Sequence, residues 1–175
     1  MLKLLSDLTG QPVVSERDGT PAGRVRQPVF DAAKGKVLAY RLGGPAAMHG
    51  SGGAYVSTVD VRAYLDHGLV IAGPEIAQPL EDLPAVRRAV DAGIEPIGLR
   101  AETNKGKRLG KVDDLTIETE GHFLTKLHVK PPWWQPTGKG LIVPRSRVER
   151  FEPGRVVLRY DSDGSTAGLE PEVAA

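Results

Sequence analysis

The sequence predicts an all-β protein made of two small antiparallel barrels in tandem, joined by a short helix. The first observation behind this prediction is an internal repeat: residues 106–112 resemble residues 19–25, and residues 142–148 resemble residues 55–61. A single shift of 87 residues relates both pairs. The second observation is that short apolar runs alternate with glycine-containing hairpin turns. Closing each short sheet into a barrel would remove its exposed edges.

Residues 1–73 are expected to form the first barrel. An Asp-Gly pair at residues 18–19 supplies the positive φ angles that a tight hairpin needs. Ser57 is expected to cap a short helical turn that continues to Leu65. The glycine-rich stretch 43–53 cannot pack a core and is expected to be a flexible loop. Strands are predicted at residues 13–15, 23–30, 37–42, 55–56 and 69–71.

Residues 74–93 are predicted to be a linker that contains one short amphipathic helix. Four apolar residues recur there at helical spacing, namely Leu80, Leu83, Val86 and Val90. Asp82 is expected to cap this helix, and Gly93 is expected to end it. The apolar stripe is expected to pack against one or both barrels, with a partner-binding helix as the alternative.

Residues 94–160 are predicted to form the second barrel on the same plan. A long loop at residues 130–139 occupies the place of the glycine-rich stretch in the first barrel. The tail, residues 161–175, is acidic and has too few apolar residues to order itself, so it is expected to be disordered. Strands are predicted at residues 97–101, 109–117, 123–129, 141–143 and 156–158.

Composition narrows the class of protein. There is no cysteine, so neither a disulfide framework nor a cysteine metal site can form. No apolar run is long enough to span a membrane as a helix, and the first residues do not read as a signal peptide, so a cytoplasmic location is expected. The net charge is +1, but residues 93–160 carry thirteen basic and eight acidic groups. The second barrel is therefore expected to be basic.

No constellation of residues indicates catalysis, a metal or a cofactor. His122 and His128 are placed on one strand about 20 Å apart, too far to share a metal. Asp113 and Asp114 are neighbours on a strand and are expected to point to opposite faces. Neither a phosphate-binding P-loop nor a serine nucleophile elbow is present. We therefore expect a protein that is not an enzyme and has no cofactor.

The segments 105–112 and 143–148, with a hairpin between them, resemble the PRC-barrel family. The resemblance covers about residues 4–72 and 94–160, although Ser57 stands where the pattern prefers proline. The family is similar to the cytoplasmic barrel of the photosynthetic reaction centre H subunit and to the C-terminal domain of the ribosome maturation factor RimM. The resemblance implies a β-barrel that binds other macromolecules, and it implies no catalytic residues.

The strongest candidates for partner binding are Trp133 and Trp134. They follow Pro131 and Pro132, which restrict the backbone and lower the entropic cost of presenting a surface. Tryptophan is also enriched among residues that dominate interface energetics. One alternative is that one or both rings fold back over the barrel mouth or the other barrel. Another is that the loop contacts RNA or a membrane.

A second candidate is a group of arginines around the last turn and strand. These are Arg145, Arg147, Arg155 and Arg159. They are expected to form a basic patch, with ordinary solvation as the alternative. Taken together, the sequence predicts a cytoplasmic adaptor that binds a protein or a complex through its second barrel. The alternative is an RNA- or ribosome-associated factor that uses the basic charge of that barrel.

Overall fold

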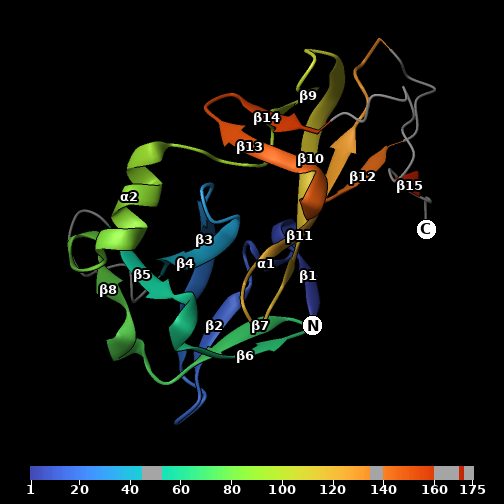
Figure 1. Cartoon of the computed structure of the whole chain (residues 1–175). Helices are drawn as coiled ribbons and strands as arrows, with labels where there is room; N and C mark the ends of the chain where they lie inside the picture. The colour runs from blue at the N-terminus through green and yellow to red at the C-terminus, as the bar shows by residue number, and fades with distance from the viewer. Residues whose placement is uncertain (45–52, 135–139, 160–169, 172–175) are drawn as a thin grey trace.

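The computed structural model describes residues 1–44, 53–134, 140–159 and 170–171 of the chain (Figure 1). Strands dominate the described residues, so the all-β prediction is confirmed at the level of fold class. The elements of the first half are β1 (Leu2–Leu4), α1 (Leu5–Leu8), β2 (Pro12–Ser15), β3 (Pro21–Asp31), β4 (Lys36–Gly43), β5 (Ala54–Ser57), η2 (Thr58–Asp60), β6 (Val61–Leu65) and β7 (Gly68–Ile71). The linker contains η3 (Pro74–Ile76), β8 (Gln78–Pro79), η4 (Leu80–Asp82) and α2 (Pro84–Ala92).

The second half repeats the order of the first. It contains β9 (Arg100–Thr103), β10 (Arg108–Glu118), β11 (Leu124–Lys130), β12 (Leu141–Pro144), η5 (Arg145–Arg147), β13 (Val148–Glu152), β14 (Arg155–Leu158) and β15 (Glu170–Pro171). The first sheet runs β6-β7-β2-β3-β4-β5-β8, and the second runs β13-β14-β9-β10-β11-β12-β15 with β1 added beside β10. Within the described residues neither path closes on itself.

The strand registers of the two sheets correspond. Val25 on β3 lies opposite Leu42 on β4, and Val112 on β10 lies opposite Val129 on β11, in each case 87 residues later. Both irregularities in the first of these pairings recur at the same shift in the second. The pairs β4–β5 and β11–β12 obey the same shift, as do β6–β7 and β13–β14.

The shift changes by one residue at the first hairpin of each half. The Ser15 N–H donates to the Thr20 carbonyl oxygen, whereas the Thr103 N–H donates to the Lys107 carbonyl oxygen. Ser15 and Thr103 are therefore matched at 88 residues, while Thr20 and Lys107 are matched at 87. The turn between β2 and β3 is one residue longer than its counterpart, so a single shift does not relate the whole length of the two halves.

A glycine bends the first long strand of each sheet close to its neighbour. Gly23 has φ 152° and Gly110 has φ 148°, values that residues with a side chain rarely adopt. A Cβ on Gly110 would overlap the carbonyl oxygen of Lys130, and one on Gly23 would overlap that of Gly43. The register of each strand is irregular beside its glycine, as is usual where a strand bends.

The helical turn after β5 is shorter than the sequence predicts. It spans only η2, and Val61 to Leu65 form β6 instead of continuing the turn. Ser57 makes no side-chain capping bond to it. The same geometry follows β12, where η5 leads into β13. Three of the five residues of β6 are exposed and two of the five residues of β13 are exposed, and neither strand shows the apolar alternation that marks a strand in a sequence.

The linker helix forms, with a different start from the one predicted. Leu83, not Asp82, precedes its first residue, and no side chain caps it. Gly93 ends the helix in the left-handed conformation, as predicted. Val86 on α2 packs in a cluster with Val29 and Tyr55, so the helix covers the face of β3, β4 and β5 (Figure 1).

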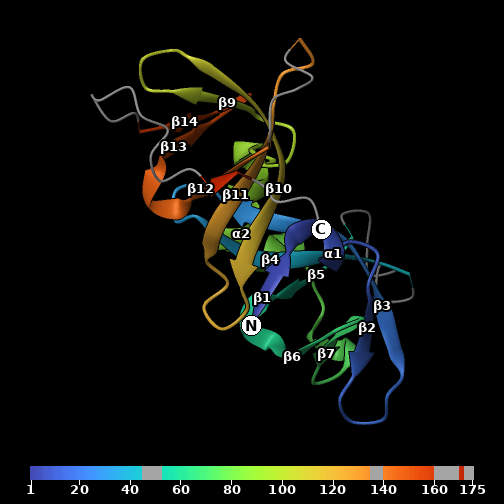
Figure 2. The same cartoon turned by 90° about the vertical axis from the view of Figure 1, so that its right-hand side faces the viewer.

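The N-terminus belongs spatially to the second sheet, which the sequence did not predict. Leu2 and Leu4 of β1 pair antiparallel with Glu118 and Thr116 of β10 (Figure 2). The backbone N–H of Ser6, on α1, donates to the buried carboxylate of Asp114 at 3.1 Å, and its hydroxyl donates to the same group. The first residues of the chain therefore strap the second half to the first.

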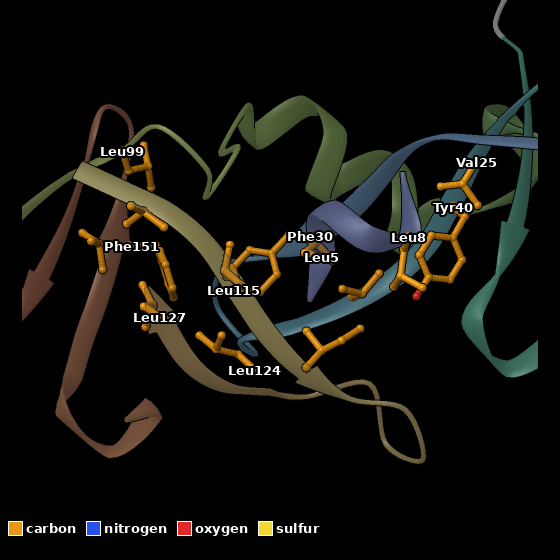
Figure 3. Close-up of a cluster of buried hydrophobic side chains, with 14 of the residues drawn as sticks. Leu5, Leu8, Val25, Phe30, Tyr40, Leu99, Leu115, Leu124, Leu127 and Phe151 are labelled. Atoms are coloured by element: carbon orange, nitrogen blue, oxygen red, sulfur yellow. The ribbon is translucent and has the colours of Figure 1, made fainter. Parts of the chain in front are cut away.

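The two sheets share one hydrophobic core. A single cluster of buried side chains takes in residues of both halves, among them Leu5, Leu8, Phe30, Leu115 and Leu127 (Figure 3). Within it the rings of Phe30 and Phe151 meet edge to face with centroids 5.1 Å apart. The halves are therefore parts of one packed body.

The tips of the two long hairpins meet in a symmetrical contact. Lys36 forms an isolated antiparallel bridge with Phe123, its own counterpart at the 87-residue shift. The Val37 N–H donates to the His122 carbonyl oxygen, and the Leu124 N–H donates to the Gly35 carbonyl oxygen, each at 2.9 Å. At the 87-residue shift Val37 matches Leu124 and Gly35 matches His122, so each bond is the counterpart of the other and the contact has local pseudo-two-fold symmetry. The expected disorder of the tail falls on residues outside the described ranges, except that β15 pairs with β12.

Candidate partner-binding surface

Trp133 and Trp134 form an exposed aromatic pair just beyond the end of β11. Trp133 is 86% exposed and Trp134 is 46% exposed. Their ring centroids lie 5.8 Å apart at an interplanar angle of 85°, so one ring meets the edge of the other. Of the preceding residues, Pro132 is buried and Pro131 is half-buried, which anchors the base of the pair. We call these two rings the tryptophan pair.

Arg108, at the start of β10, flanks the tryptophan pair. Its guanidinium group lies 4.7 Å from the centroid of the Trp134 ring, a distance typical of a cation–π contact. At the end of β11, Lys130 Nζ pairs with Asp113 Oδ1 at 2.6 Å. Asp113 is exposed while its neighbour Asp114 is buried, as expected for opposite faces of a strand. The surface thus combines aromatic rings with alternating charges.

The four arginines of the predicted basic patch lie around η5 and β14. Arg145 is half-buried, and its Nη1 donates to the Val148 carbonyl oxygen at 2.9 Å. The backbone N–H of Arg159 donates to the Arg147 carbonyl oxygen at 2.7 Å, which brings these two residues together. Arg155 instead faces acidic partners: its Nε lies 2.6 Å from Glu152 Oε2.

The charges near Arg155 form a mixed network. Arg150 Nε lies 2.5 Å from Glu152 Oε1, and Arg155 Nη1 lies 3.5 Å from Glu102 Oε2. The hydrogen bonds from Arg150 and then from Arg155 lower the pKa of the Glu152 carboxyl. Glu152 therefore stays ionised and offsets the positive charge of both arginines. The face that looked basic in the sequence carries acidic groups, one of them from a distant strand.

A hydrogen-bonded chain of buried and half-buried side chains joins the two halves, and the sequence analysis missed it. The Tyr40 and Tyr64 hydroxyl oxygens are 3.0 Å apart, and the Tyr64 oxygen lies 3.1 Å from His122 Nδ1. Burial raises the pKa of Tyr64 to about 12 and also raises the pKa of Tyr40. Burial, and then the Lys36 charge, lower the pKa of His122. These three side chains are therefore neutral at pH 7 and tie the sheets together.

The histidines are placed differently from the prediction. His122 precedes β11 and has φ 63°, whereas His128 lies on β11. The prediction that both histidines lie on one strand is therefore wrong. His128 Nε2 lies 2.8 Å from the Thr116 hydroxyl oxygen. In the described part of the chain, three or more potential metal-binding side chains do not gather anywhere. At the 87-residue shift His122 matches Gly35, which has φ 64°. A glycine at the matched position could have indicated that His122 also adopts a positive φ.

Among the described residues, no helix has the length and apolarity needed to cross a lipid bilayer. Comparison with protein families matches residues 92–164 to the PRC-barrel domain. The resemblance found in the sequence is thereby confirmed for the second half of the chain. A search of curated proteins found no match.

Proposed function

We propose that this chain, which carries a PRC-barrel domain over residues 92–164, is a cytoplasmic adaptor that binds a protein partner through its tryptophan pair. The proposal needs no catalytic group and no cofactor. The observation that carries it is the exposure of Trp133, which is 86% exposed. Most of the other described aromatic residues are packed against neighbouring side chains. An apolar ring of this size gains free energy when a partner removes it from water.

The base of the tryptophan pair supports its use as a binding surface. Pro131 and Pro132 limit the conformations of the loop, and Pro132 is buried. The contact between Arg108 and Trp134 further orients the second ring. Preorganised aromatic groups lose little conformational entropy when a partner binds. The shared core contains neither tryptophan, so we expect the chain to fold without them.

The charge distribution favours a protein over RNA as the partner. Sites for nucleic acid need cations that are free to contact phosphates. Arg155 and Arg150 face Glu152, and half-buried Arg145 donates to a backbone carbonyl group. An alternation of acidic and basic side chains suits a protein surface of matching charges.

We further propose that the first half is a second PRC-like barrel and that the chain arose by tandem duplication. Support comes from the strand registers, which correspond at one shift through three pairs of strands. Matching bend glycines, Gly23 and Gly110, add to it. A duplicated scaffold would leave one copy free to contribute stability while the other presents the tryptophan pair.

The test is affinity capture from the native cell with the full chain as bait, with and without nuclease. A double variant, Trp133→Ala with Trp134→Ala, is compared with a control that removes other exposed apolar groups, Val59→Ala with Leu65→Ala. Val59 is 77% exposed and Leu65 is 49% exposed, so the two variants are matched in exposure. Thermal melting of each variant shows whether its fold is retained.

For a protein partner, the tryptophan variant weakens binding by about 2 kcal/mol or more per dominant residue, with little dependence on salt. The control variant retains the partner. Loss of all captured material after nuclease treatment would contradict the proposal and identify an RNA-associated factor. In that case affinity would fall steeply with salt and depend on the arginines between Arg145 and Arg159. If the tryptophan variant is stable and captures the same partner as before, the tryptophan pair is not the binding surface.

A further inference from the structure

A cavity of about 360 Å³ opens on the first sheet, where α2 ends and the chain crosses to the second half. Its walls come from β3, from the adjoining positions of β4 and β5, and from residues 93–97. The size lies within the range of small-molecule sites, roughly 300 to 1,000 Å³. The cavity shares no lining residue with the tryptophan pair, so a ligand in it would be independent of the proposed function.

The interior of the cavity is apolar. Val29, Phe30 and Tyr55 line it and are each less than a tenth exposed. Val90 and Ile97 also line it, and they remain 38% and 43% exposed. A ligand with an apolar body would cover these two side chains and remove them from water.

A row of polar groups lines the side of the cavity formed by the first sheet. Gln27, Arg41 and Tyr55 lie directly opposite one another on β3, β4 and β5, so their side chains project from the same face of the sheet. The Tyr55 hydroxyl group makes no hydrogen bond with the described residues. Every fully buried side-chain oxygen among these residues does have a partner. The hydroxyl is therefore accessible to solvent, and Tyr55 lines the cavity.

Two arginines give the cavity a positive charge. Neither Arg26 nor Arg41 makes a hydrogen bond or an ion pair with the described residues, and both line the cavity. The one acidic lining residue is Glu95, whose Oε1 accepts a hydrogen bond from Gln27 Nε2 at 2.8 Å. Two guanidinium groups against one carboxylate leave a net charge of +1.

In the second sheet, the polar side chains at the matching positions have hydrogen-bond partners within the protein. Asp114 and His128 occupy the positions that correspond to Gln27 and Arg41. Asp114 accepts hydrogen bonds from Ser6, and His128 is bonded to Thr116. In the first sheet the corresponding place holds an arginine that has no partner among the described residues, beside a cavity.

We propose that this cavity binds a small organic anion, a carboxylate carried on an apolar body. The carboxylate accepts hydrogen bonds from Arg41 and Arg26 at the mouth, because guanidinium groups match carboxylate geometry. The Tyr55 hydroxyl donates to the same group or to a polar substituent beside it. The apolar body lies between Phe30, Val90 and Ile97.

The test uses the full chain and three probes of equal chain length: octanoate, octan-1-ol and octylammonium. Isothermal titration measures affinity, and amide chemical shifts locate the binding site. The variants are Arg41→Met and Arg26→Met, which keep an apolar stem but remove the charge. Arg62→Met is the matched control, because Arg62 is an exposed arginine on β6 that does not line the cavity.

Octanoate is expected to bind more tightly than octan-1-ol, and octylammonium is expected to bind least. Each cavity variant should weaken octanoate binding by about tenfold or more, the usual worth of a hydrogen bond to a charged group. Binding of octan-1-ol should change little, and Arg62→Met should leave octanoate binding as it was. Amides of β3 and of residues 93–97 should shift on titration.

Three results would overturn the inference. The first is equal affinity for octanoate and octan-1-ol, which would show an apolar surface without anion recognition. The second is an equal loss with Arg62→Met and Arg41→Met, which would show attraction by overall charge. The third is no heat and no shift at millimolar octanoate. Thermal melting of each variant, and partial recovery with Arg41→Lys, separate loss of a contact from loss of the fold.

Discussion

At the scale of single residues, His122 carries an unusual combination of backbone and protonation state. Its φ of 63° places it in the left-handed region, and the residue is 8% exposed. The Tyr64 hydroxyl group lies within hydrogen-bonding distance of Nδ1. A neutral ring suits this site, because burial and the Lys36 charge both oppose protonation, while Glu118 only partly offsets them.

We expect the protein to lose stability as the pH falls. Histidine in an unfolded chain has a pKa of about 6.5, and the pKa of His122 in the folded protein is lower. The unfolded state therefore binds more protons between these two values, and the free energy of unfolding decreases as the pH drops below about 7. Urea unfolding at a series of pH values from about 7.5 to about 5 measures this slope.

The variant His122→Asn should reduce that slope, because asparagine does not titrate and tolerates a positive φ. His67→Asn, at an exposed site on the turn between β6 and β7, is the control. An unchanged slope in His122→Asn would show that another group governs the acid sensitivity.

Gly110 is a residue whose replacement should reveal steric conflict directly. Gly110→Ala places a methyl group against the Lys130 carbonyl oxygen at a φ of 148°. We expect a loss of about 2–4 kcal/mol, since overpacking and backbone strain each cost about 1–3 kcal/mol. Gly98→Ala, where φ is 90° and nothing lies within 4 Å, should cost about 1–2 kcal/mol. Denaturant unfolding measures both losses. Equal losses of stability in the two variants would show that backbone strain alone accounts for the effect of Gly110→Ala.

At the scale of elements, the sequence predicted the long strands that recur in both halves. It missed the short strands and the pairing between distant parts of the chain. The long strands β3, β4, β10 and β11 were recognised because hairpin turns bound each one. The edge strands β6 and β13 were missed because neither alternates apolar and polar residues along its length, and β1 was missed because its partner lies more than a hundred residues away. A three-residue strand has no pattern of its own, so only its pairing reveals it.

The candidate surface was predictable to a similar degree. Adjacent tryptophans after two prolines marked the loop, and the exposed pair lies there. The contact of Arg155 with Glu102 could not be foreseen, because Glu102 is far from it in sequence and comes near only through the parallel pairing of β14 with β9. Charge counted along a sequence therefore overstates charge on a folded face.

The strap formed by β1 and α1 yields a prediction for Ser6. Ser6→Ala removes the hydroxyl that donates to Asp114 and leaves one oxygen of a buried carboxylate less well satisfied. We expect a loss of about 1–3 kcal/mol in the free energy of unfolding. Ser146→Ala, at an exposed serine on η5, should change stability by less than about 0.5 kcal/mol. A neutral Ser6→Ala would show that the backbone bonds alone hold the strap.

At the scale of the whole molecule, several connections among the described residues hold the two halves together. They include the strap at the N-terminus, the paired hairpin tips, the hydrogen-bonded chain from Tyr40 to His122, and the hydrophobic core with its Phe30–Phe151 contact. Each connection joins residues far apart in sequence. Opening one half would expose the core of the other, so the free energies of the halves are coupled.

We therefore expect the chain to unfold in one cooperative transition despite its internal repeat. Phe30→Ala should lower the stability by about 3–5 kcal/mol, because Phe30 is 4% exposed in the centre of the shared core. Although Phe30 lies on the first sheet, hydrogen exchange should speed up by the same factor in β4 and in β11. Calorimetry should give equal calorimetric and van't Hoff enthalpies. Two separate transitions, with β11 still protected after β4 has opened, would show instead that the core contacts between the halves contribute little and that each half folds as a unit.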